Sequence, residues 1–441
     1  MVISTTFMRL KSIFIMVLTF RRMLMSGLLD GLRSRMKNIP VVDIHTHINP
    51  EKPWAEEPET ILLYHYIVTE LATAGVSRDV LERRDMPEVL RNMRLIRNTS
   101  TYWCLLRILR DLYGLDEEDL SPERWNETRE TMKAASRKPE WVRQVLKKAG
   151  VKKVFLTMDY ASPIPSYDRD LFVGGLRVDP LISRISKASI DRLGERTGIE
   201  VSTSEGLSDA LAKLFDVFRG YIRTVTVSLQ PEDVFKPPDR FETGEALKRM
   251  YSDLPLREED VRAISSYVVH EMLTLCKEND LVFQLMLGVR RPVPGASPPD
   301  YAIVVHEKEA LTNYCRNLFS RFREVRFDLI VACELQTHEV AVVAKNYPNV
   351  YFSGFWWYSF YPSIIRRSLT ERLQILPRNK VCGFFSDAYV VEWIYGKLCL
   401  VKEQIAHVLA EMVEQGYYSR ELAYELAEDL LYRNPVEIYR L

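Results

Sequence analysis

The pattern of hydrophobic positions predicts eight short strands after residue 40. Each is a run of β-branched, aromatic and other apolar residues bounded by turn residues, and most runs are continuously apolar. Continuous apolar runs are expected of parallel strands that are covered on both faces. The predicted strands span residues 41–45, 153–158, 176–180, 224–229, 281–287, 329–334, 350–355 and 381–387.

Helical patterns lie between several of these strands, for example over residues 204–222 and 337–349. Strands that alternate with helices indicate a (β/α)8 TIM barrel. A doubly wound nucleotide-binding sheet is the weaker alternative, because the chain has neither a GxGxxG nor a GxxxxGK[ST] motif.

The spacing of the predicted strands is uneven. About a hundred residues separate the first two strands, and residues 54–150 have the pattern of successive helices. We predict that they form a large helical insertion after the first strand, in a loop on the face where barrels build their active sites. A second helical insertion is predicted at about 230–280. The whole barrel is expected to span residues 39–441.

Residues 1–38 are predicted to be an N-terminal extension, either disordered or the product of a mis-assigned start, with the body of the protein beginning near Met25. The apolar run at 13–20 is shorter than the roughly 20 residues that cross a bilayer, so no membrane span is expected. A helix lying on a membrane surface is the alternative for this segment.

Composition narrows the range of partners. Sixty basic residues balance sixty acidic ones, so no net charge favours nucleic acid, and nucleic-acid binding is not expected. Six scattered cysteines without a CxxC pair disfavour a disulfide framework and a thiolate zinc site. Free thiols favour a cytoplasmic location. A homo-oligomer is left open, since barrels of this size commonly associate.

Candidate metal ligands lie at the ends of the first and last predicted strands. His45 and His47 share one face of the first strand, because strand side chains alternate. Asp387 closes the eighth strand, which neighbours the first in a closed barrel. The three side chains could therefore bind one divalent ion. The alternatives are two half-buried polar histidines and an aspartate that caps the next helix.

HxH on strand one with Asp on strand eight resembles the amidohydrolase superfamily, and further motifs resemble its uronate isomerases (glucuronate isomerase). These motifs occur in order from about residue 39 to the C-terminus and include the helical insertion. They are IPVVDIHTHINP, LLYHYIVTEL, RNTSTYWCLLRILRDLYG, VFLTMDY, LRVDPL, FQLMLGVR, SGFWWYSF, VCGFFSDAYVVEWIYGKLCLV and NPVEIY.

The resemblance implies a metal-dependent aldose–ketose isomerase that acts on a hexuronate (glucuronate or galacturonate) or a related sugar acid. It implies that His45, His47 and Asp387 bind one divalent metal ion, with zinc favoured and manganese or another metal open. Asp387 would also be the catalytic base, and His65 and Tyr66 would assist proton transfer or hold hydroxyl groups. Without the resemblance, His65 is more simply a core histidine.

Three further residues have implied roles in substrate binding. Arg177 would hold the substrate carboxylate through its guanidinium fork, the alternative being a surface salt bridge. Trp356 and Trp357 match a motif after the seventh strand and would form an apolar wall for the sugar ring. Because adjacent strand residues face opposite ways, we expect at least one of these tryptophans to lie in the core.

The chain departs from the family pattern at several positions. Met286 replaces a histidine on strand five, and Tyr389 replaces an arginine two residues after Asp387. Strand four has no lysine for a bridging carbamate, strand six ends in Glu334, and His338 lies a turn beyond. These departures disfavour a two-metal hydrolase. A mononuclear hydrolase or decarboxylase, and a barrel that has lost catalysis and serves as a binding protein, remain as alternatives.

Overall fold

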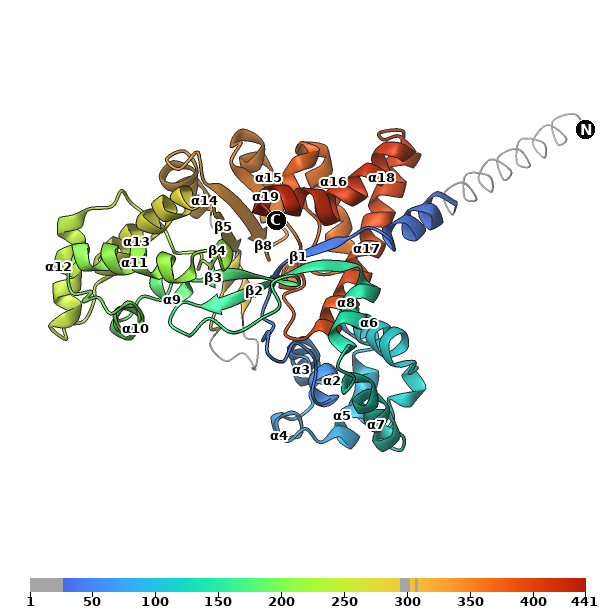
Figure 1. Cartoon of the computed structure of the whole chain (residues 1–441). Helices are drawn as coiled ribbons and strands as arrows, with labels where there is room; N and C mark the ends of the chain where they lie inside the picture. The colour runs from blue at the N-terminus through green and yellow to red at the C-terminus, as the bar shows by residue number, and fades with distance from the viewer. Residues whose placement is uncertain (1–26, 294–301, 306–307) are drawn as a thin grey trace, which may run out of the picture.

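The computed structural model describes residues 27–293, 302–305 and 308–441 (Figure 1). Most of the segment predicted to be an extension, residues 1–26, lies outside this part of the chain. Residues 27–36 form a helix in which Leu32 and Met36 are buried. Within the described residues, no helix is long and apolar enough to cross a membrane.

Eight parallel strands form the central sheet, and neighbouring strands follow one another along the chain. The order is β1 (Val41–Thr46), β2 (Val151–Asp159), β3 (Phe172–Arg177), β4 (Ile222–Ser228), β5 (Val282–Leu287), β8 (Arg326–Val331), β9 (Val350–Ser353) and β10 (Val381–Cys382). All seven neighbouring pairs are parallel. Short strands β6 (Val289–Arg290) and β7 (Ile303–Val304) form a separate antiparallel pair.

The ring is completed by the segment that follows β10, which hydrogen-bonds to β1. The backbone N–H of Asp387 donates to the carbonyl of His45 at 3.0 Å, and that of His47 donates to the carbonyl of Ala388 at 2.8 Å. The N–H of Ser386 donates to the buried carboxylate of Asp43 at 2.9 Å. The (β/α)8 barrel predicted from the sequence is therefore confirmed.

The third strand lies earlier than predicted. Strand β3 covers FVGGLR, whereas the prediction began at Leu176 and ran to residue 180; Asp179 instead begins helix α9 (Asp179–Ile182). Gly174 and Gly175 weaken the strand pattern in the sequence, because glycine is a poor strand former. A Cβ at Gly174 would lie 2.5 Å from the carbonyl oxygen of Tyr221, so the close approach of the chain to β4 requires glycine here.

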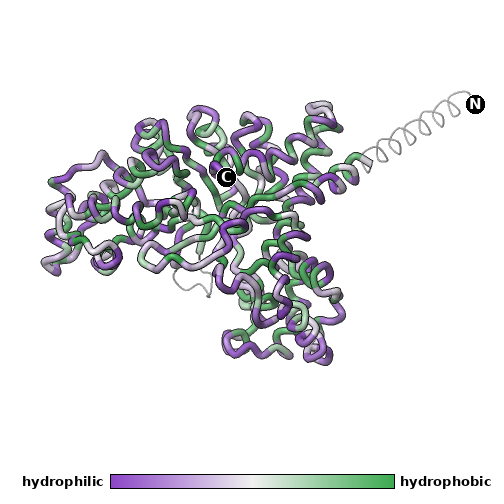
Figure 2. The backbone as a smooth tube through the Cα atoms, viewed as in Figure 1, coloured by the Kyte–Doolittle hydropathy of each residue, from purple (hydrophilic) through white to green (hydrophobic). Residues whose placement is uncertain are grey.

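Helices pack around the sheet and bury its outer face. Those that contact strands include α8 (Trp141–Ala149) on β2, α9 on β4, α13 (Glu258–Glu278) on β5, α15 (Gln336–Asn346) on β8 and β9, and α19 (Asn434–Tyr439) on β1 and β10. Others lie around them: α10 (Lys187–Thr197), α11 (Ser204–Phe218), α12 (Arg240–Tyr251), α14 (Lys308–Tyr314), α16 (Pro362–Ile375), α17 (Val391–Glu414) and α18 (Arg420–Glu428). Apolar residues concentrate along the strands and on the helix faces turned toward them (Figure 2).

The long interval between β1 and β2 is helical, as predicted. It contains α2 (Glu59–Leu62), α3 (His65–Thr73), α4 (Arg78–Glu82), α5 (Met86–Asn92), α6 (Ser100–Ile108) and α7 (Trp125–Ser136). These helices form a group that projects from the barrel, with α6 packed against α17 (Figure 1). The first residues of α3 reach the pocket described below.

Candidate active site

A pocket opens at the carboxyl ends of the barrel strands, where TIM barrels carry their active sites. Its free volume, counting the open mouth, is about 560 Å³, which is in the range of small-molecule pockets. It is lined by His45, His47, His65, Tyr66, Arg177, Asp179, Thr226, Ser228, Met286, Arg291, Trp356, Trp357, Asp387 and Tyr389. All eight residues singled out as functional in the sequence are among these lining residues.

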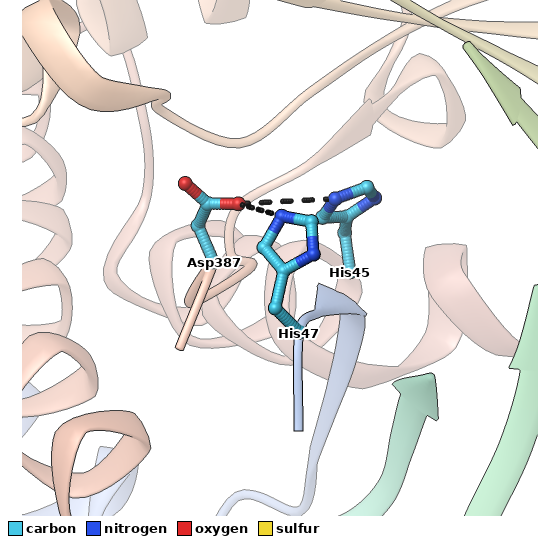
Figure 3. Close-up of side chains that lie close together, drawn as sticks. All are labelled: His45, His47 and Asp387. Atoms are coloured by element: carbon cyan, nitrogen blue, oxygen red, sulfur yellow. Dashed lines mark ion pairs between the residues drawn. The ribbon is translucent and has the colours of Figure 1, made fainter. Parts of the chain in front are cut away.

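His45, His47 and Asp387 converge on one point at the base of this pocket (Figure 3). The Oδ1 atom of Asp387 lies 3.1 Å from Nε2 of His47 and 3.8 Å from Nε2 of His45. One ligand atom from each residue lies within 4.8 Å of the other two. Figure 3 shows the second oxygen of Asp387 turned away from both rings. This spacing suits a single ion with two imidazole nitrogens and one carboxylate oxygen.

The tautomer of His45 is set by Gln284 of β5. Nδ1 of His45 lies 2.7 Å from Oε1 of Gln284, which can only accept a hydrogen bond. Nδ1 therefore carries the proton, and the lone pair of Nε2 faces Asp387. Burial lowers the pKa of His45 to about 4, so the ring is neutral near pH 7. A neutral imidazole with a free nitrogen is the form that binds metals.

The tautomer of His47 is set in a similar way by Thr157 of β2. The hydroxyl of Thr157 donates to the carbonyl of Thr46 at 2.9 Å, so its oxygen accepts from Nδ1 of His47, also at 2.9 Å. Nε2 of His47 is then free toward Asp387. A ligand histidine usually donates its second ring N–H to a neighbour in this manner.

The site has unsatisfied polar atoms where an ion would lie. Nε2 of His45 and Oδ1 of Asp387 are buried and have no hydrogen-bond partner among the described residues. The positive charge of Lys397 favours the ionised form of Asp387. An ionised carboxylate and two imidazole lone pairs fit a divalent cation. In the described part of the chain, this is the one such cluster of three potential ligands.

Asp387 does not cap the helix that follows it. Helix α17 begins at Val391, with Val390 at the capping position, so the capping alternative does not hold. Asp387 has φ of 53°, a left-handed conformation that is uncommon for residues other than glycine. The chain turns sharply at this residue, and its carboxylate faces the two histidines.

His65 and Tyr66 begin helix α3 and extend from the insertion into the pocket. The ring of Tyr66 stacks on that of Trp357, with centroids 6.4 Å apart and 14° between the planes. Nζ of buried Lys397 lies 4.6 Å from the Tyr66 ring centroid. Burial, followed by the charge of Lys397, lowers the pKa of His65 to about 3, so His65 is a neutral pocket residue rather than a charged one.

Arg177 ends strand β3 and faces the pocket. Its Nε donates to Oδ2 of Asp179 at 3.0 Å, and the other oxygen of Asp179 accepts from the N–H of Ser228 at 3.2 Å. The Arg177 side chain is 39% exposed, whereas that of Asp179 is 7% exposed. Asp179 thus anchors one edge of the guanidinium and leaves the rest available to an anion in the pocket.

Trp356 and Trp357 both line the pocket, and both are also buried in a hydrophobic cluster, in agreement with the expectation that at least one of them lies in the core. Strand β9 ends at Ser353, so the alternation of strand side chains does not extend to these residues. Trp357 has φ of 46° and begins a short 3-10 helix, which changes the direction of its side chain relative to an extended chain.

The two positions that depart from the family pattern both lie at the pocket. Met286 is 4% exposed on β5 and packs in a cluster that includes Trp356 and Ile330. Tyr389 is half-exposed, and its ring stacks on His47 with centroids 5.2 Å apart and an interplanar angle of 26°. Met286 therefore extends an apolar wall, and Tyr389 covers one face of the His47 ring.

Arg291 is a pocket residue that the sequence analysis missed. It follows β6, and its guanidinium lies over the ring of Trp357, 5.4 Å from the centroid. Its Nε is buried and has no hydrogen-bond partner among the described residues. The sequence feature that could have indicated its role is the pair of arginines just after a predicted strand, because barrel loops at that end carry functional groups. Arg291 brings a second fixed positive charge to the pocket beside Arg177.

Glu334 and His338 lie outside the pocket. Glu334 pairs with Arg367 at 2.6 Å, and His338 is 68% exposed beside Glu371. Neither residue is placed to bind a second ion next to His45 and His47, in agreement with a mononuclear site.

No protein-family model matches the chain. It is 20% identical to a uronate isomerase of Thermotoga sp. (strain RQ2), over 92% of this chain and 96% of that protein. Its fold is similar to the crystal structures of uronate isomerase from Thermotoga maritima and of glucuronate isomerase from Caulobacter crescentus. Both give a TM-score of 0.82 at 18% identity and cover 94% of this chain, with 97% and 94% of the respective relatives.

The chain is a divergent relative of the uronate isomerases. The similarity extends over nearly the full length of both proteins, including the insertion that carries His65 and Tyr66. At this identity, the likeness to the two solved uronate isomerase structures establishes the TIM-barrel fold. The roles of individual residues rest on the geometry of the pocket.

Proposed function

We propose that this protein is a metal-dependent isomerase that interconverts the aldose and ketose forms of a hexuronate such as glucuronate or galacturonate. The observation that carries the proposal is the convergence of His45, His47 and Asp387 at the base of a pocket that also holds two arginines. The two histidines and Asp387 suit a cation that binds sugar oxygens, and the two arginines suit a carboxylate.

His45, His47 and Asp387 would hold one divalent ion, and we favour zinc because two imidazoles and a carboxylate are typical zinc ligands. When bound, the ion would polarise substrate oxygens and stabilise negative charge that develops on them. The two oxygens of Asp387 allow it a second role. The oxygen that turns away from the histidine rings is free to accept a proton from the substrate.

Isomerisation moves one proton between neighbouring carbons. Asp387 would remove the proton from C2 of the aldehyde form, while the Tyr66 hydroxyl gives its proton to O1, which yields an enediol. Tyr66 would then take the proton from the O2 hydroxyl, and Asp387 would return its proton to C1. The product is a ketose of the same mass, and both side chains regain their starting protonation states.

The substrate carboxylate would lie between Arg177 and Arg291. Guanidinium groups bind carboxylates through paired, charge-assisted hydrogen bonds. Tyr389 replaces an arginine of the family pattern and cannot supply a fixed positive charge. Arg291 supplies one, so the pocket has two guanidinium groups, those of Arg177 and Arg291. The Tyr66, Trp356 and Trp357 rings offer apolar surface to the sugar carbons.

The six cysteines are free thiols, which suits an enzyme of the reducing cytoplasm. We place the protein there and regard a small sugar acid as its partner.

The experiment that tests the function is product analysis. Metal-loaded protein is incubated separately with glucuronate and galacturonate, and the products are identified by NMR and mass spectrometry. A ketose of unchanged mass supports the proposal. Loss of carbon dioxide would indicate a decarboxylase, and no conversion of either sugar acid would remove hexuronates from the substrate list.

A further inference from the structure

A line of buried hydrogen bonds connects His45 to the C-terminal helix α19. Gln284 on β5 contacts His45, Tyr439 on α19 contacts Gln284, and Asp328 on β8 contacts Tyr439. The three bonds measure 2.7, 2.8 and 2.5 Å in that order. Gln284, Asp328 and Tyr439 are each at most 1% exposed. We call Gln284, Tyr439 and Asp328 the relay.

Asp328, at the end of the relay farthest from His45, determines which group donates in each hydrogen bond. An ionised carboxylate can only accept, so the hydroxyl of Tyr439 donates to Oδ2 of Asp328. The oxygen of Tyr439 then accepts from Nε2 of Gln284. This leaves Oε1 of Gln284 facing His45, and Nδ1–H of His45 donates to it.

Asp328 is suited to fix this direction. Burial raises its pKa to about 6, which still leaves it mostly ionised at neutral pH. Hydrogen bonding from Ser353, Tyr439 and Gln284, followed by the charge of buried Arg372, opposes that rise. Tyr439 contributes the short hydrogen bond, at 2.5 Å to Oδ2 of Asp328.

The reverse orientation of the Gln284 amide is unfavourable. Its Nε2 also lies 3.4 Å from the carbonyl oxygen of Ile44, and its Oε1 accepts from the hydroxyl of Thr226 at 3.0 Å. A flipped amide would place oxygen against the Ile44 carbonyl and turn N–H toward His45. Nδ1 of His45 would then have to accept, and the ring proton would sit on Nε2, where it blocks a metal.

We propose that Tyr439 and Asp328 are positioning residues for the metal centre: they hold Gln284 in the orientation that leaves Nε2 of His45 free to bind. Helix α19 thereby influences the metal site through buried hydrogen bonds, although none of its residues lines the pocket. The inference rests on the metal site proposed above, and it adds residues that do not contact substrate or metal.

The first test measures metal affinity. Zinc binding to full-length wild-type protein, Tyr439→Phe and Asp328→Asn is measured by competition with a chromophoric chelator. Tyr439→Phe removes the donor to Asp328 and the acceptor for Gln284, so we expect zinc to bind about 10- to 100-fold more weakly. The same weakening is expected for Asp328→Asn, whose amide can donate to Tyr439 and reverse the relay.

Tyr314→Phe is the matched control. Tyr314 is also buried, and its hydroxyl also makes one short hydrogen bond, 2.7 Å to the carbonyl of Asp233, but it lies outside the relay. Its zinc affinity should equal that of the wild type. Circular dichroism and thermal unfolding of the metal-free variants report whether each is folded. Equal zinc affinity in folded Tyr439→Phe and wild type would overturn the inference.

A second test requires neither metal nor a variant of the relay residues. Long-range ¹H–¹⁵N spectra of metal-free protein labelled at its seven histidines report which ring nitrogen carries the proton. We expect Nδ1–H at His45, assigned by its loss in His45→Gln. A proton on Nε2 of His45 would overturn the inference even if the variants failed to fold. Absence of zinc binding by wild type with Nδ1–H intact would instead count against the proposed function.

Discussion

Oδ1 of Asp387 lies 3.1 Å from Nε2 of His47, a contact between the segments that follow the last and the first strands of the barrel. Backbone hydrogen bonds between the same two segments hold the side chains at this distance. The proposed metal centre therefore lies where the barrel closes, and the backbone hydrogen bonds of the barrel set its geometry.

The first prediction concerns Asp387. Asp387→Asn keeps the shape of the side chain but removes its negative charge and its ability to accept a proton. We expect the turnover of hexuronate to fall by at least about 100-fold, the lower range for the loss of a general base. Turnover is measured by NMR. Asp79→Asn, an exposed acid on α4, should leave it unchanged. Retained turnover in Asp387→Asn would remove this residue from the mechanism.

The second prediction concerns stability. Zinc at a free concentration of 100 times its Kd should stabilise the folded protein by about 2.7 kcal/mol. For a chain of this length, that corresponds to a rise in melting temperature of about 3 °C. The rise is measured by thermal unfolding of metal-free protein with and without zinc. A double variant, His45→Ala with His47→Ala, should not show it. The same rise in that variant would place the metal elsewhere.

Much of this arrangement was predictable from the sequence. Continuous apolar runs located the eight strands, and the HxH motif and Asp387 marked the two ends of the barrel. Strand β3 was misplaced because Gly174 and Gly175 lack strand propensity. The alternation of strand side chains does not apply to Trp356 and Trp357, because the backbone leaves the strand conformation before it reaches them.

Arg291 and the relay were harder to predict. The relay joins residues from β5, β8 and α19, and single-sequence patterns do not reveal which buried polar groups meet across a barrel. Gln284 and Asp328 each look like isolated polar residues in apolar strands. Their pairing follows from the barrel register and from the position of the last helix.

The third prediction concerns substrate binding. Arg177→Met and Arg291→Met each remove a guanidinium that we expect to bind the substrate carboxylate. Loss of such charge-assisted hydrogen bonds costs about 1.5–3 kcal/mol, so KM should rise by about 10- to 100-fold. Steady-state kinetics with glucuronate measure this change. Arg367→Met, outside the pocket, is the control. An unchanged KM in both pocket variants would place the carboxylate elsewhere.

The fourth prediction concerns pH. The folded-state pKa of His65 is about 3, whereas that of an unfolded histidine is near 6.5. As the pH falls below 6.5, the unfolded chain takes up a proton that the folded protein excludes, so stability is lost. Between pH 7 and pH 5, the His65 contribution to this loss is about 1–2 kcal/mol.

His65→Gln isolates this contribution, because other buried groups, such as Asp43 with its pKa raised to about 7, have the opposite pH dependence. Urea unfolding of metal-free wild type and His65→Gln is measured at pH 7 and pH 5. The wild type should lose about 1–2 kcal/mol more than the variant over this interval. Equal losses would show that His65 is solvated and titrates normally.

The most direct test of the account is the restoration of turnover by metal. Chelator-treated protein is mixed with glucuronate or galacturonate, zinc is added in steps, and the ketose is quantified by NMR. The account predicts no turnover without metal and a rise that levels off at one ion per chain, absent in Asp387→Asn. Undiminished turnover in metal-free protein, or no ketose at any amount of zinc or manganese, would contradict it.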